Sequence, residues 1–354
     1  MSGNKINVIG LMSGTSLDGL DIVYVCFDID SAISFKIIYS ETIPYSNDWK
    51  CRLQDGIHKS KEELKLLDVE YGVYLGNQVN VFIKKNNISD IHFIASHGHT
   101  ILHQPEKGIT LQVGDGKEIS VITNHTVVCD FRTQDVKLGG QGAPLVPIGD
   151  ASLFSNYDAC LNLGGFANVS FDVDDERIAF DICPVNIVLN HYVAKVGFGY
   201  DDKGRNAATG KVNATLLKQL NALSFYSKNY PKSLGLEWVQ AMIFPIIDAF
   251  PLSIKDVLRT FVEHIAMQIG DVTKECESIL VTGGGVFNTF LIERIKHYAI
   301  AEILLPNNEV VNYKEALIFA YLGLLKMENK VNCLKSVTGA IRDHSSGVIF
   351  IPKK

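Results

Sequence analysis

The sequence predicts an α/β protein made of two similar domains. Two segments, residues 5–29 and 158–173, each contain apolar runs typical of strands, separated by a short turn that contains glycine. In each half a further strand and a helix follow, so the second half is a weak repeat of the first. The length of 354 residues is sufficient for two domains of ordinary size.

The first half opens with three predicted strands and a long helix. The strands cover residues 5–12, 21–29 and 34–43. Both faces of the second strand are mostly apolar, which indicates burial within a mixed sheet. Ser60 and Glu63 form a capping-box pattern, and apolar residues at helical spacing continue from there to about residue 85. A short buried strand at 92–95 then ends at a Ser-His-Gly-His-Thr segment.

The change of domain is predicted near the glycine-rich segment 139–145. We expect a first domain of residues 1–130 with about 332–354, and a second domain of residues 131–331. The predicted strands of the second domain cover residues 158–163, 169–173, 177–182 and 278–282. Helices are predicted after Pro184, after Asn288 as an N-cap, and over an apolar stretch at 315–327.

Composition and charge exclude several classes of protein. The net charge of -6 and the pI near 5.9 argue against a nucleic-acid surface, which would show a basic stripe. No run of about 18 apolar residues is present, so no membrane span is expected. The N-terminus leads directly into a strand without the apolar region of a signal peptide. The seven cysteines are scattered without a C-x-x-C pair, which favours reduced thiols in a cytoplasm and no zinc site.

Three glycine turns, at 13–19, 164–168 and 283–288, each come directly after a predicted strand. Successive backbone N–H groups in such a turn can bind an anion, and glycine lets the backbone approach a ligand closely. The first turn adds hydroxyl groups, while Asp18 and Asp21 would suit a cation rather than a phosphate. By spacing alone, a hairpin turn that is rich in glycine for geometry is an equally good interpretation of the first turn.

Three such turns in a duplicated architecture resemble those of the actin, sugar-kinase and Hsp70 ATPase superfamily. There, one turn from each domain holds phosphate and a third supports the adenosine. The resemblance implies two actin-like, ribonuclease H-like domains with an active-site cleft between them, and ATP with Mg²⁺ as cofactors. No residue is assigned as a metal ligand.

A closer resemblance is to the anhydro-N-acetylmuramic acid kinases. It is carried by motifs in family order over almost the whole chain: Gly-Leu-Met-Ser-Gly-Thr-Ser-Leu-Asp-Gly-Leu-Asp at 10–21, Ser-His-Gly-His-Thr at 96–100, Thr-Leu-Gln-Val-Gly-Asp at 110–115, Asp-Phe-Arg at 130–132, Gly-Gly-Gln-Gly-Ala-Pro-Leu at 139–145, Asn-Leu-Gly-Gly at 162–165, Pro-Lys-Ser at 231–233, Gly-Gly-Gly at 283–285 and Glu-Ala at 315–316. The first motif and the motif at 139–145 are the specific ones.

This resemblance implies ATP-dependent phosphorylation of the 6-oxygen of 1,6-anhydro-N-acetylmuramic acid, with water opening the anhydro bridge. Asp181 matches the aspartate that the family uses as general base for that water. The chain departs from the family motif directly after it, with Ile182, Cys183 and Val185 in place of Thr, Gly and Gly. It also has Val286-Phe287 in place of Ala-His, and Leu236 where the family has Arg.

The expected contacts divide into two sets. The ATP-binding residues are Gly14, Thr15, Ser16, Leu17, Asp18, Gly19, Leu20, Asp21, Gly164, Gly165, Asn168, Gly283, Gly284, Gly285 and Asn288. The substrate-binding residues are His97, Asp130, Arg132, Gln141 and Glu315. The expected partners are a small sugar and ATP, in cytoplasmic recycling of cell-wall sugar, with no nucleic acid and no membrane. The sequence leaves open whether the chain forms a homodimer.

Local chemistry offers a plainer interpretation of several of these residues. Asp181 suits the N-cap of the helix that follows it, and Glu315 suits the first turn of a helix. Arg132 suits a buried ion pair with Asp130 or Asp135 as well as it suits phosphate or substrate. His97, with His99 and His103, favours a sugar hydroxyl contact over zinc, because no Cys or carboxylate lies at ligand spacing.

Two other functions remain open. One is a kinase for another anhydro sugar, such as a levoglucosan-like substrate, because the residues after Asp181 differ from the family pattern. The other is a non-enzymatic ATP switch of the same superfamily, which would bind ATP and change shape without phosphorylating a sugar.

Overall fold

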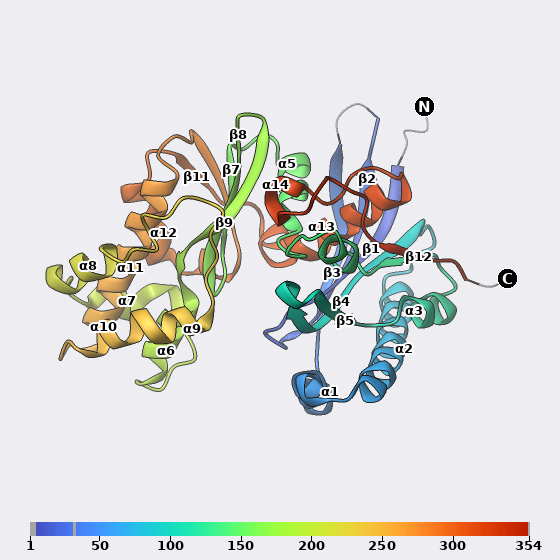
Figure 1. Cartoon of the computed structure of the whole chain (residues 1–354), viewed down its shortest axis with the longest axis horizontal. Coiled ribbons are helices and arrows are strands. Elements are labelled where there is room, and N and C mark those ends of the chain that lie inside the picture. Colours follow the sequence, from blue (N-terminus) through green and yellow to red (C-terminus); the bar gives the residue numbers. More distant parts are fainter. Residues whose placement is uncertain (1–4, 31–32, 353–354) are drawn as a thin grey trace. The chain divides into compact units, whose positions relative to one another are not determined.

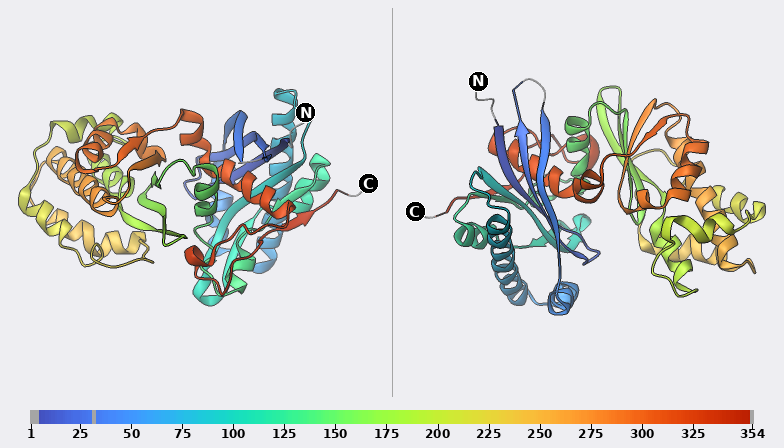
Figure 2. Two further views of the ribbon diagram at one scale, coloured as in Figure 1. Left: turned by 90° about the horizontal axis from the view of Figure 1, so that it is seen from above. Right: turned by 180° about the vertical axis from the view of Figure 1, so that it is seen from behind.

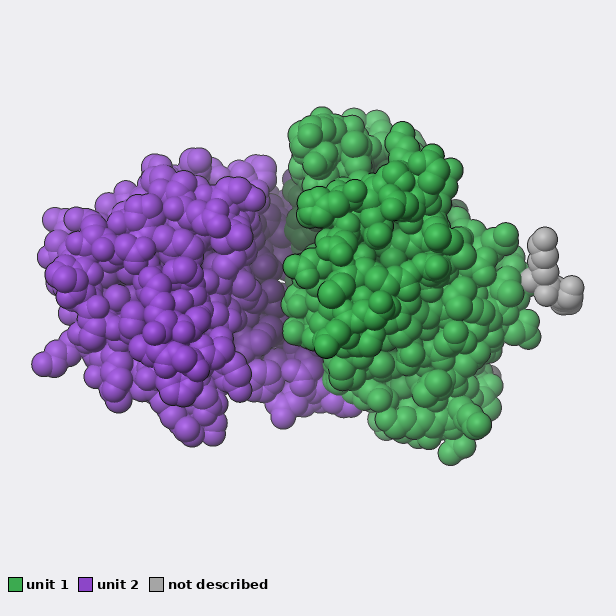
Figure 3. Space-filling model, turned by 90° about the horizontal axis from the view of Figure 1, so that it is seen from below, with its two compact units in different colours: residues 1–153, 313–354 green, residues 154–312 purple. Residues whose placement is uncertain are grey.

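The computed structural model describes residues 5–30 and 33–352. The chain divides into two compact units, which are coloured separately in Figure 3. Unit 1 contains residues 1–153 and 313–354, and unit 2 contains residues 154–312.

Unit 1 is built on a seven-stranded mixed sheet (Figure 1). Its strands are β1 (Lys5–Ser13), β2 (Gly19–Asp28), β3 (Ser34–Pro44), β4 (Phe93–Gln104), β5 (Ile109–Val113), β6 (Val127–Cys129) and β12 (Val348–Phe350). The order is β12-β6-β4-β1-β2-β3, with β5 paired to β4. β1, β2 and β3 form an antiparallel meander, whereas β4 runs parallel to β1 and β6 runs parallel to β4.

Unit 2 repeats this topology in a five-stranded sheet. Its strands are β7 (Ala159–Leu163), β8 (Phe166–Val173), β9 (Glu176–Pro184), β10 (Ser278–Thr282) and β11 (Glu302–Leu304), in the order β11-β10-β7-β8-β9. β7, β8 and β9 are an antiparallel meander, and β10 and β11 extend the sheet in parallel from β7. The expected two-domain α/β fold with an internal repeat is therefore confirmed.

Two long helices, α2 (Lys61–Lys85) and α13 (Asn308–Met327), cover opposite faces of the first sheet (Figure 2). On one face Ile9 and Leu11 pack with Leu67 and Tyr71 of α2 in one buried cluster. Gly10 points to the other face because side chains alternate along a strand, and a Cβ there would collide with the backbone of α13. The shorter helices of this unit are α1 (Asn47–Gln54), α3 (Gly116–Thr123), α4 (Thr133–Lys137), α5 (Val146–Leu153) and α14 (Lys335–Thr338).

The core of unit 2 forms around α11 (Ile254–Val272), whose apolar side chains pack with strands β7 to β10. Ser253 caps this helix by accepting a hydrogen bond from the backbone of Asp256 at 3.2 Å. The other helices are α6 (Asn186–Ala194), α7 (Arg205–Thr209), α8 (Ala214–Asn221), α9 (Leu236–Trp238), α10 (Phe244–Asp248) and α12 (Thr289–Tyr298). Within the described ranges, no helix combines the length and apolar character that a bilayer crossing requires.

Three expectations differ from the structure. The strand expected at 92–95 continues to Gln104, because it pairs with both β1 and β5. The helix expected from 315 begins at Asn308. The units change at 153/154 and 312/313 rather than near 130 and 331, since α5 and most of α13 pack in unit 1. A buried ion pair at 2.7 Å between Asp150 and Lys314 joins these two helices.

Candidate active site

The first glycine loop, Gly14–Asp18, joins β1 to β2 in unit 1. The backbone N–H of Leu17 donates to the carbonyl of Gly14 at 3.2 Å, which closes a tight turn. Leu17 has a positive φ of 59°, and Thr15, Ser16 and Asp18 are exposed. The turn therefore presents two hydroxyl groups and one carboxylate to solvent, as a loop that contacts phosphate and a cation would.

The glycines of the motif at 10–21 differ in whether a larger residue would fit. A Cβ on Gly19 would lie 2.5 Å from the carbonyl oxygen of Ile43 on the paired strand β3. Gly10 is crowded by α13 in the same way. At Gly14 the nearest atom to an added Cβ is the Ser16 hydroxyl oxygen, at 3.6 Å. Packing thus accounts for Gly10 and Gly19 but not for Gly14, which lies in the open turn.

A buried hydrogen-bond chain holds the end of β1 beneath this loop. The Tyr45 hydroxyl donates to Ser13 Oγ at 2.7 Å, and Ser13 lies 2.8 Å from His99 Nδ1. Burial lowers the pKa of His99 to about 4, so its ring is neutral, and one hydrogen bond joins Nδ1 to the Ser13 hydroxyl. Ser13 is therefore committed to the protein, and the loop's accessible hydroxyls are those of Thr15 and Ser16.

Two carboxylates, Asp18 in the turn and Asp21 on β2, lie close to one another. Asp21 accepts a 2.6 Å hydrogen bond from the Thr42 hydroxyl, while burial and the neighbouring Asp18 raise its pKa. Two aspartates that repel one another next to a hydroxyl-rich loop have the chemistry of a Mg²⁺-binding group, because oxygen ligands of this kind suit that ion. Asp18 and Asp21 are therefore the side chains of unit 1 that fit the expected cation.

Arg132 is held by two hydrogen bonds. Its Nε donates to His97 Nε2 at 2.9 Å, and its Nη1 donates to the carbonyl of Gly142 at 2.6 Å. His97 Nδ1 donates to the carbonyl of Gly98 at 3.0 Å. Burial and the adjacent Arg132 hold the pKa of His97 well below its usual value, so the ring is neutral. The two hydrogen bonds use both ring nitrogens within the protein. His97 consequently acts on the orientation of Arg132.

The ion pair considered for Arg132, with Asp130 or Asp135, does not form within the described structure. Its Nη2 atom has no hydrogen-bond partner among the described residues, so a donor remains for a ligand. Glu315 lies on α13 and interacts electrostatically with both Arg132 and Asp21. Desolvation by the surrounding protein raises the pKa of Glu315, and the positive charge of Arg132 opposes this rise. Because α13 begins at Asn308, Glu315 does not belong to the first turn.

A hollow of about 340 Å³ in unit 1 brings together His97 and Asp130 from the expected substrate set. Asp68 and Asp115, which the sequence reasoning missed as site residues, also line it. Burial, followed by repulsion from Asp115 and Asp130, raises the pKa of Asp68 to about 6, although the Gly114 N–H donates to it at 2.7 Å. In the sequence, Asp68 could have been found as a carboxylate next to the apolar face of the helix predicted at 61–85. Gln141 lies outside this lining and is exposed.

The two glycine turns of unit 2 lie side by side. Gly164-Gly165 joins β7 to β8, and Gly283–Gly285 follows β10, whose Thr282 pairs with Asn162 of the parallel strand β7. A Cβ on Gly283 would lie 2.9 Å from the backbone of Leu163, and the residue has a φ of 86°. Gly165 and Gly284 are exposed and uncrowded. The Gly164 N–H and both carbonyls of the Gly164-Gly165 turn are bonded within the protein, so the accessible backbone is that of the exposed Gly165 and Gly284, at the carboxyl ends of adjacent parallel strands, where ligands bind in α/β sheets.

The two asparagines expected to contact ATP differ in their surroundings. Asn288 is the N-cap of α12, as predicted, and its Oδ1 accepts from the Leu291 N–H at 3.0 Å. Asn168 is exposed on β8, directly opposite Asp181 on β9. Residues opposite one another in an antiparallel pair share a face, so Asn168 and Asp181 are neighbours.

Asp181 is held in place by the segment 231–235. Its backbone N–H donates to the carbonyl of Lys232 at 3.1 Å, and its Oδ2 accepts from the Leu234 N–H at 2.8 Å. Oδ1 has no hydrogen-bond partner among the described residues. Burial raises the pKa of Asp181, and the Leu234 hydrogen bond opposes this rise. The N-cap of the following helix α6 is Val185, so Asp181 does not cap it.

The residues that depart from the family motif are packed in the core of unit 2. Ile182, Cys183 and Val185 are 1%, 0% and 0% exposed. The Val185 N–H donates to the carbonyl of Gly165 at 2.8 Å, and Asn186 Nδ2 donates to the carbonyl of Gly164 at 2.8 Å. This segment thus supports the glycine turn from beneath, and its altered side chains contribute to packing.

Each unit has a sheet in which an antiparallel meander of three strands is extended by parallel strands, and each has a glycine turn between its first two strands. This arrangement is an actin-like fold, which many sugar kinases and ATPases share. The model of the family described as anhydro-N-acetylmuramic acid kinase matches residues 6–352. The chain belongs to this family.

Relatives that carry the name anhydro-N-acetylmuramic acid kinase match the chain over nearly its whole length. The protein of Saccharophagus degradans is 34% identical over 370 residues, which cover 97% of this chain and 98% of that protein. The protein of Haemophilus influenzae is 34% identical over 374 residues, which cover 97% of each.

Solved structures are more distant. The activator of the 2-hydroxyisocaproyl-CoA dehydratase from Clostridium difficile, with bound ADPNP, matches with a TM-score of 0.44 at 11% identity, over 91% of this chain and 97% of that chain. A ROK family glucokinase from Streptomyces griseus, in complex with glucose and AMPPNP, matches with a TM-score of 0.39 at 11% identity, over 89% of this chain and 98% of that chain.

Proposed function

We propose that this chain is an ATP-dependent kinase that acts on 1,6-anhydro-N-acetylmuramic acid. It phosphorylates the 6-oxygen and opens the anhydro bridge with water, giving N-acetylmuramic acid 6-phosphate and ADP. The observation that carries the proposal is Asp181, a desolvated carboxylate held by the Leu234 N–H through one oxygen and free at the other. A general base in phosphoryl transfer needs this combination of fixed orientation and accessible lone pair.

In the proposed reaction, Asp181 Oδ1 takes a proton from a water molecule. The water oxygen bonds to the anomeric carbon, and the bond from that carbon to the bridging oxygen breaks. The released 6-oxygen attacks the γ-phosphorus of ATP, and ADP leaves with the electron pair of the broken P–O bond. The orienting groups, Leu234 N–H and the β8–β9 pairing, keep Oδ1 directed at the water.

The remaining groups have proposed binding roles. The Gly14–Asp21 segment and the Gly164-Gly165 turn bind phosphates through the backbone N–H groups that are not already donated within the protein, as those of Leu17 and Gly164 are, and the Gly283–Gly285 turn with Asn288 supports the adenosine. Bound Mg²⁺ would neutralise charge on the phosphates, with Asp18 and Asp21 as the side chains that fit it. The unpartnered Nη2 of Arg132 is the donor proposed for the sugar. His97, Asp130, Gln141 and Glu315 complete the proposed sugar set, and the proposed setting is the cytoplasm.

The test measures ADP release with purified full-length protein, ATP, Mg²⁺ and the anhydro sugar. In ¹⁸O-labelled water, the product is expected to carry one labelled oxygen at the anomeric carbon, because ring opening uses water. Asp181→Asn is expected to lower the rate by about 10²- to 10⁴-fold, the usual contribution of a positioned general base. Asp174→Asn, on the exposed β8–β9 turn, is the matched control and is expected to keep the wild-type rate.

Three results would contradict the proposal. ADP formation with levoglucosan but not with the muramic sugar would assign another anhydro-sugar substrate. ATP binding without sugar-dependent ADP formation would favour an ATP switch. A near wild-type rate in Asp181→Asn would remove Asp181 from the role of general base.

A further inference from the structure

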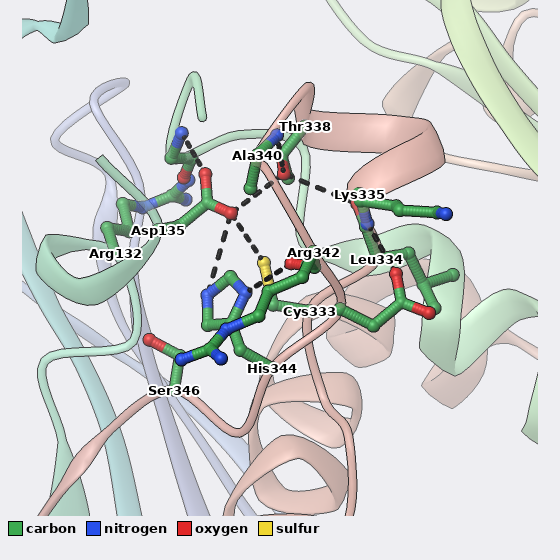
Figure 4. Close-up of polar contacts among 12 residues, drawn as sticks. Arg132, Asp135, Cys333, Leu334, Lys335, Thr338, Ala340, Arg342, His344 and Ser346 are labelled. Carbon is green, nitrogen blue, oxygen red and sulfur yellow. Dashed lines mark hydrogen bonds and ion pairs between the residues drawn. The ribbon is translucent and has the colours of Figure 1, made fainter. Parts of the chain in front are cut away.

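A buried cluster outside the proposed active site joins the C-terminal segment of unit 1 to α4. It consists of Asp135 on α4 with Cys333 and His344, as drawn in Figure 4. Each residue offers one potential ligand atom, a carboxylate oxygen, a sulfur and an imidazole nitrogen, and these three atoms lie within 4.8 Å of one another. Asp135 Oδ1 is 3.0 Å from Cys333 Sγ and 3.6 Å from His344 Nε2.

The histidine is oriented as a metal-bound imidazole would be. His344 Nδ1 lies 3.2 Å from the carbonyl of Arg342, so it is assigned as the protonated nitrogen and as the donor. With Nδ1 as the donor, Nε2 of a neutral ring carries the lone pair, and it points at Asp135 (Figure 4). The side chain is 3% exposed, and Nε2 has no hydrogen-bond partner. A backbone carbonyl that fixes the tautomer from the far side of the ring is the usual support of a metal-binding histidine.

We propose that Asp135 Oδ1, Cys333 Sγ and His344 Nε2 bind a zinc ion. Oxygen, sulfur and nitrogen ligands together suit zinc, whereas Mg²⁺ prefers oxygen ligands alone. The aspartate and the thiolate supply two negative charges, which balance the charge of the ion. Thr338 Oγ1, 2.7 Å from Asp135 Oδ1, marks the fourth side of the cluster, where the hydroxyl or a water completes a tetrahedron.

A hydrogen-bond network without metal explains only part of this geometry. The Cys333 thiol and the Thr338 hydroxyl both donate to Asp135 Oδ1, which satisfies those three groups. It leaves His344 Nε2 at 3.6 Å from Asp135 Oδ1, an ion-pair distance if the ring is protonated but too long for a hydrogen bond, so the buried nitrogen of a neutral ring has no hydrogen-bond partner. Zinc uses that lone pair and displaces the thiol proton to solvent, so every member of the cluster is satisfied.

The proposed ion has a structural role. The other oxygen of Asp135, Oδ2, accepts from the Gly142 N–H at 2.7 Å. The Gln141 N–H donates to the carbonyl of Thr338 at 2.8 Å. Zinc on Asp135 would therefore hold the C-terminal segment 332–346 and the 139–142 loop together. This inference does not depend on the proposed function.

The test is metal content of the full-length protein, purified without chelators, then stripped, reloaded with zinc and passed through a desalting column. Wild type is expected to retain about one zinc per chain, because the three protein ligands are buried and preformed. Cys333→Ser and His344→Gln are each expected to retain less than about a tenth of that amount. Cys160→Ser, another buried cysteine of the chain, is the matched control and is expected to retain the wild-type amount.

Cobalt gives a second readout. A cobalt-loaded wild-type protein is expected to show a thiolate-to-cobalt charge-transfer band that is absent in Cys333→Ser and present in His344→Gln at reduced cobalt affinity. Wild-type protein that is folded by circular dichroism yet retains no more zinc than His344→Gln would overturn the proposal. So would a chelator that leaves the melting temperature of zinc-loaded wild type unchanged.

Discussion

Asn168 and Asp181 lie directly opposite each other on β8 and β9, next to the bulge between Ala167 and Asn168. The pairing places an exposed amide beside a desolvated carboxylate that a backbone N–H holds in one orientation. This relationship ties the proposed general base to the strand that follows the Gly164-Gly165 turn. It also makes Asp181 sensitive to changes that do not touch its own side chain.

Removing the backbone donor to Asp181 is expected to alter the pH dependence of the reaction. Leu234→Pro lacks the N–H that lowers the pKa of Asp181, so the pKa rises further. A general base works when ionised, and the acidic limb of kcat/KM therefore moves to higher pH. Leu234→Ala keeps the N–H and is expected to keep the wild-type profile. Identical profiles for both variants would show that Asp181 does not set this limb.

Asp181→Asn is expected to gain stability as it loses activity. The folded-state pKa of Asp181 is raised, so folding favours its neutral form. Stability from this group is complete below the unfolded-state pKa and is lost as pH rises through the folded-state pKa. The urea midpoint of Asp181→Asn should therefore exceed that of wild type at pH 7, and the two should converge in acid. A lower midpoint for the variant at pH 7 would contradict this account.

Acid is expected to destabilise unit 1 through His99. Its pKa is about 4 in the folded protein, below the usual value of 6.5, so the unfolded chain binds the proton first. Stability is complete above 6.5 and falls as pH drops toward 4. One such proton contributes a slope of up to about 1.4 kcal/mol per pH unit. Urea unfolding between these pH values should show a smaller slope for His99→Gln, whereas exposed His58→Gln should match wild type.

Two glycines of the first motif are expected to respond differently to alanine. Gly19→Ala places a Cβ 2.5 Å from the carbonyl oxygen of Ile43, and such overpacking costs about 1–3 kcal/mol of unfolding free energy. Gly14→Ala meets no atom nearer than 3.6 Å, so its stability should be close to wild type. Its effect is expected on KM for ATP, about tenfold, if the turn contacts phosphate. Thermal melts and ATP titrations separate the two effects, and equal melting temperatures would refute the packing argument.

Arg132→Lys is expected to impair the reaction although it keeps the charge. A lysine carries its donors on one nitrogen, so it lacks the planar fork by which Arg132 reaches His97 Nε2 from Nε and the Gly142 carbonyl from Nη1 while Nη2 is held in place. We expect kcat/KM for the sugar to fall about 10²-fold, since misplaced binding groups cost that much. Arg205→Lys, on the surface of unit 2, is the control. Unchanged sugar kinetics in Arg132→Lys would remove Arg132 from the substrate site.

Local patterns predicted most of the elements, and long-range pairing accounts for the misses. The capping box at Ser60 and Glu63, the strand at 278–282 and the cap at Asn288 appear as expected, because each depends on neighbouring residues. The lengthening of β4 to Gln104 depends on its pairing with β1 and β5. The start of α13 at Asn308 was missed because polar residues alternate with Val310 and Val311 ahead of Glu315 and interrupt the apolar run.

The sequence by itself determined the repeated α/β plan, the positions of the glycine turns and the family, because strand alternation, turn glycines and motif order are local properties. Only the tertiary structure decided what particular side chains do. It committed Ser13 and His97 to partners within the protein, removed the helix-cap interpretation of Asp181, and assembled Asp135 with Cys333 and His344. Those contacts join residues that are far apart in the chain, and the spacing of residues in the sequence does not predict which of them will meet in the folded protein.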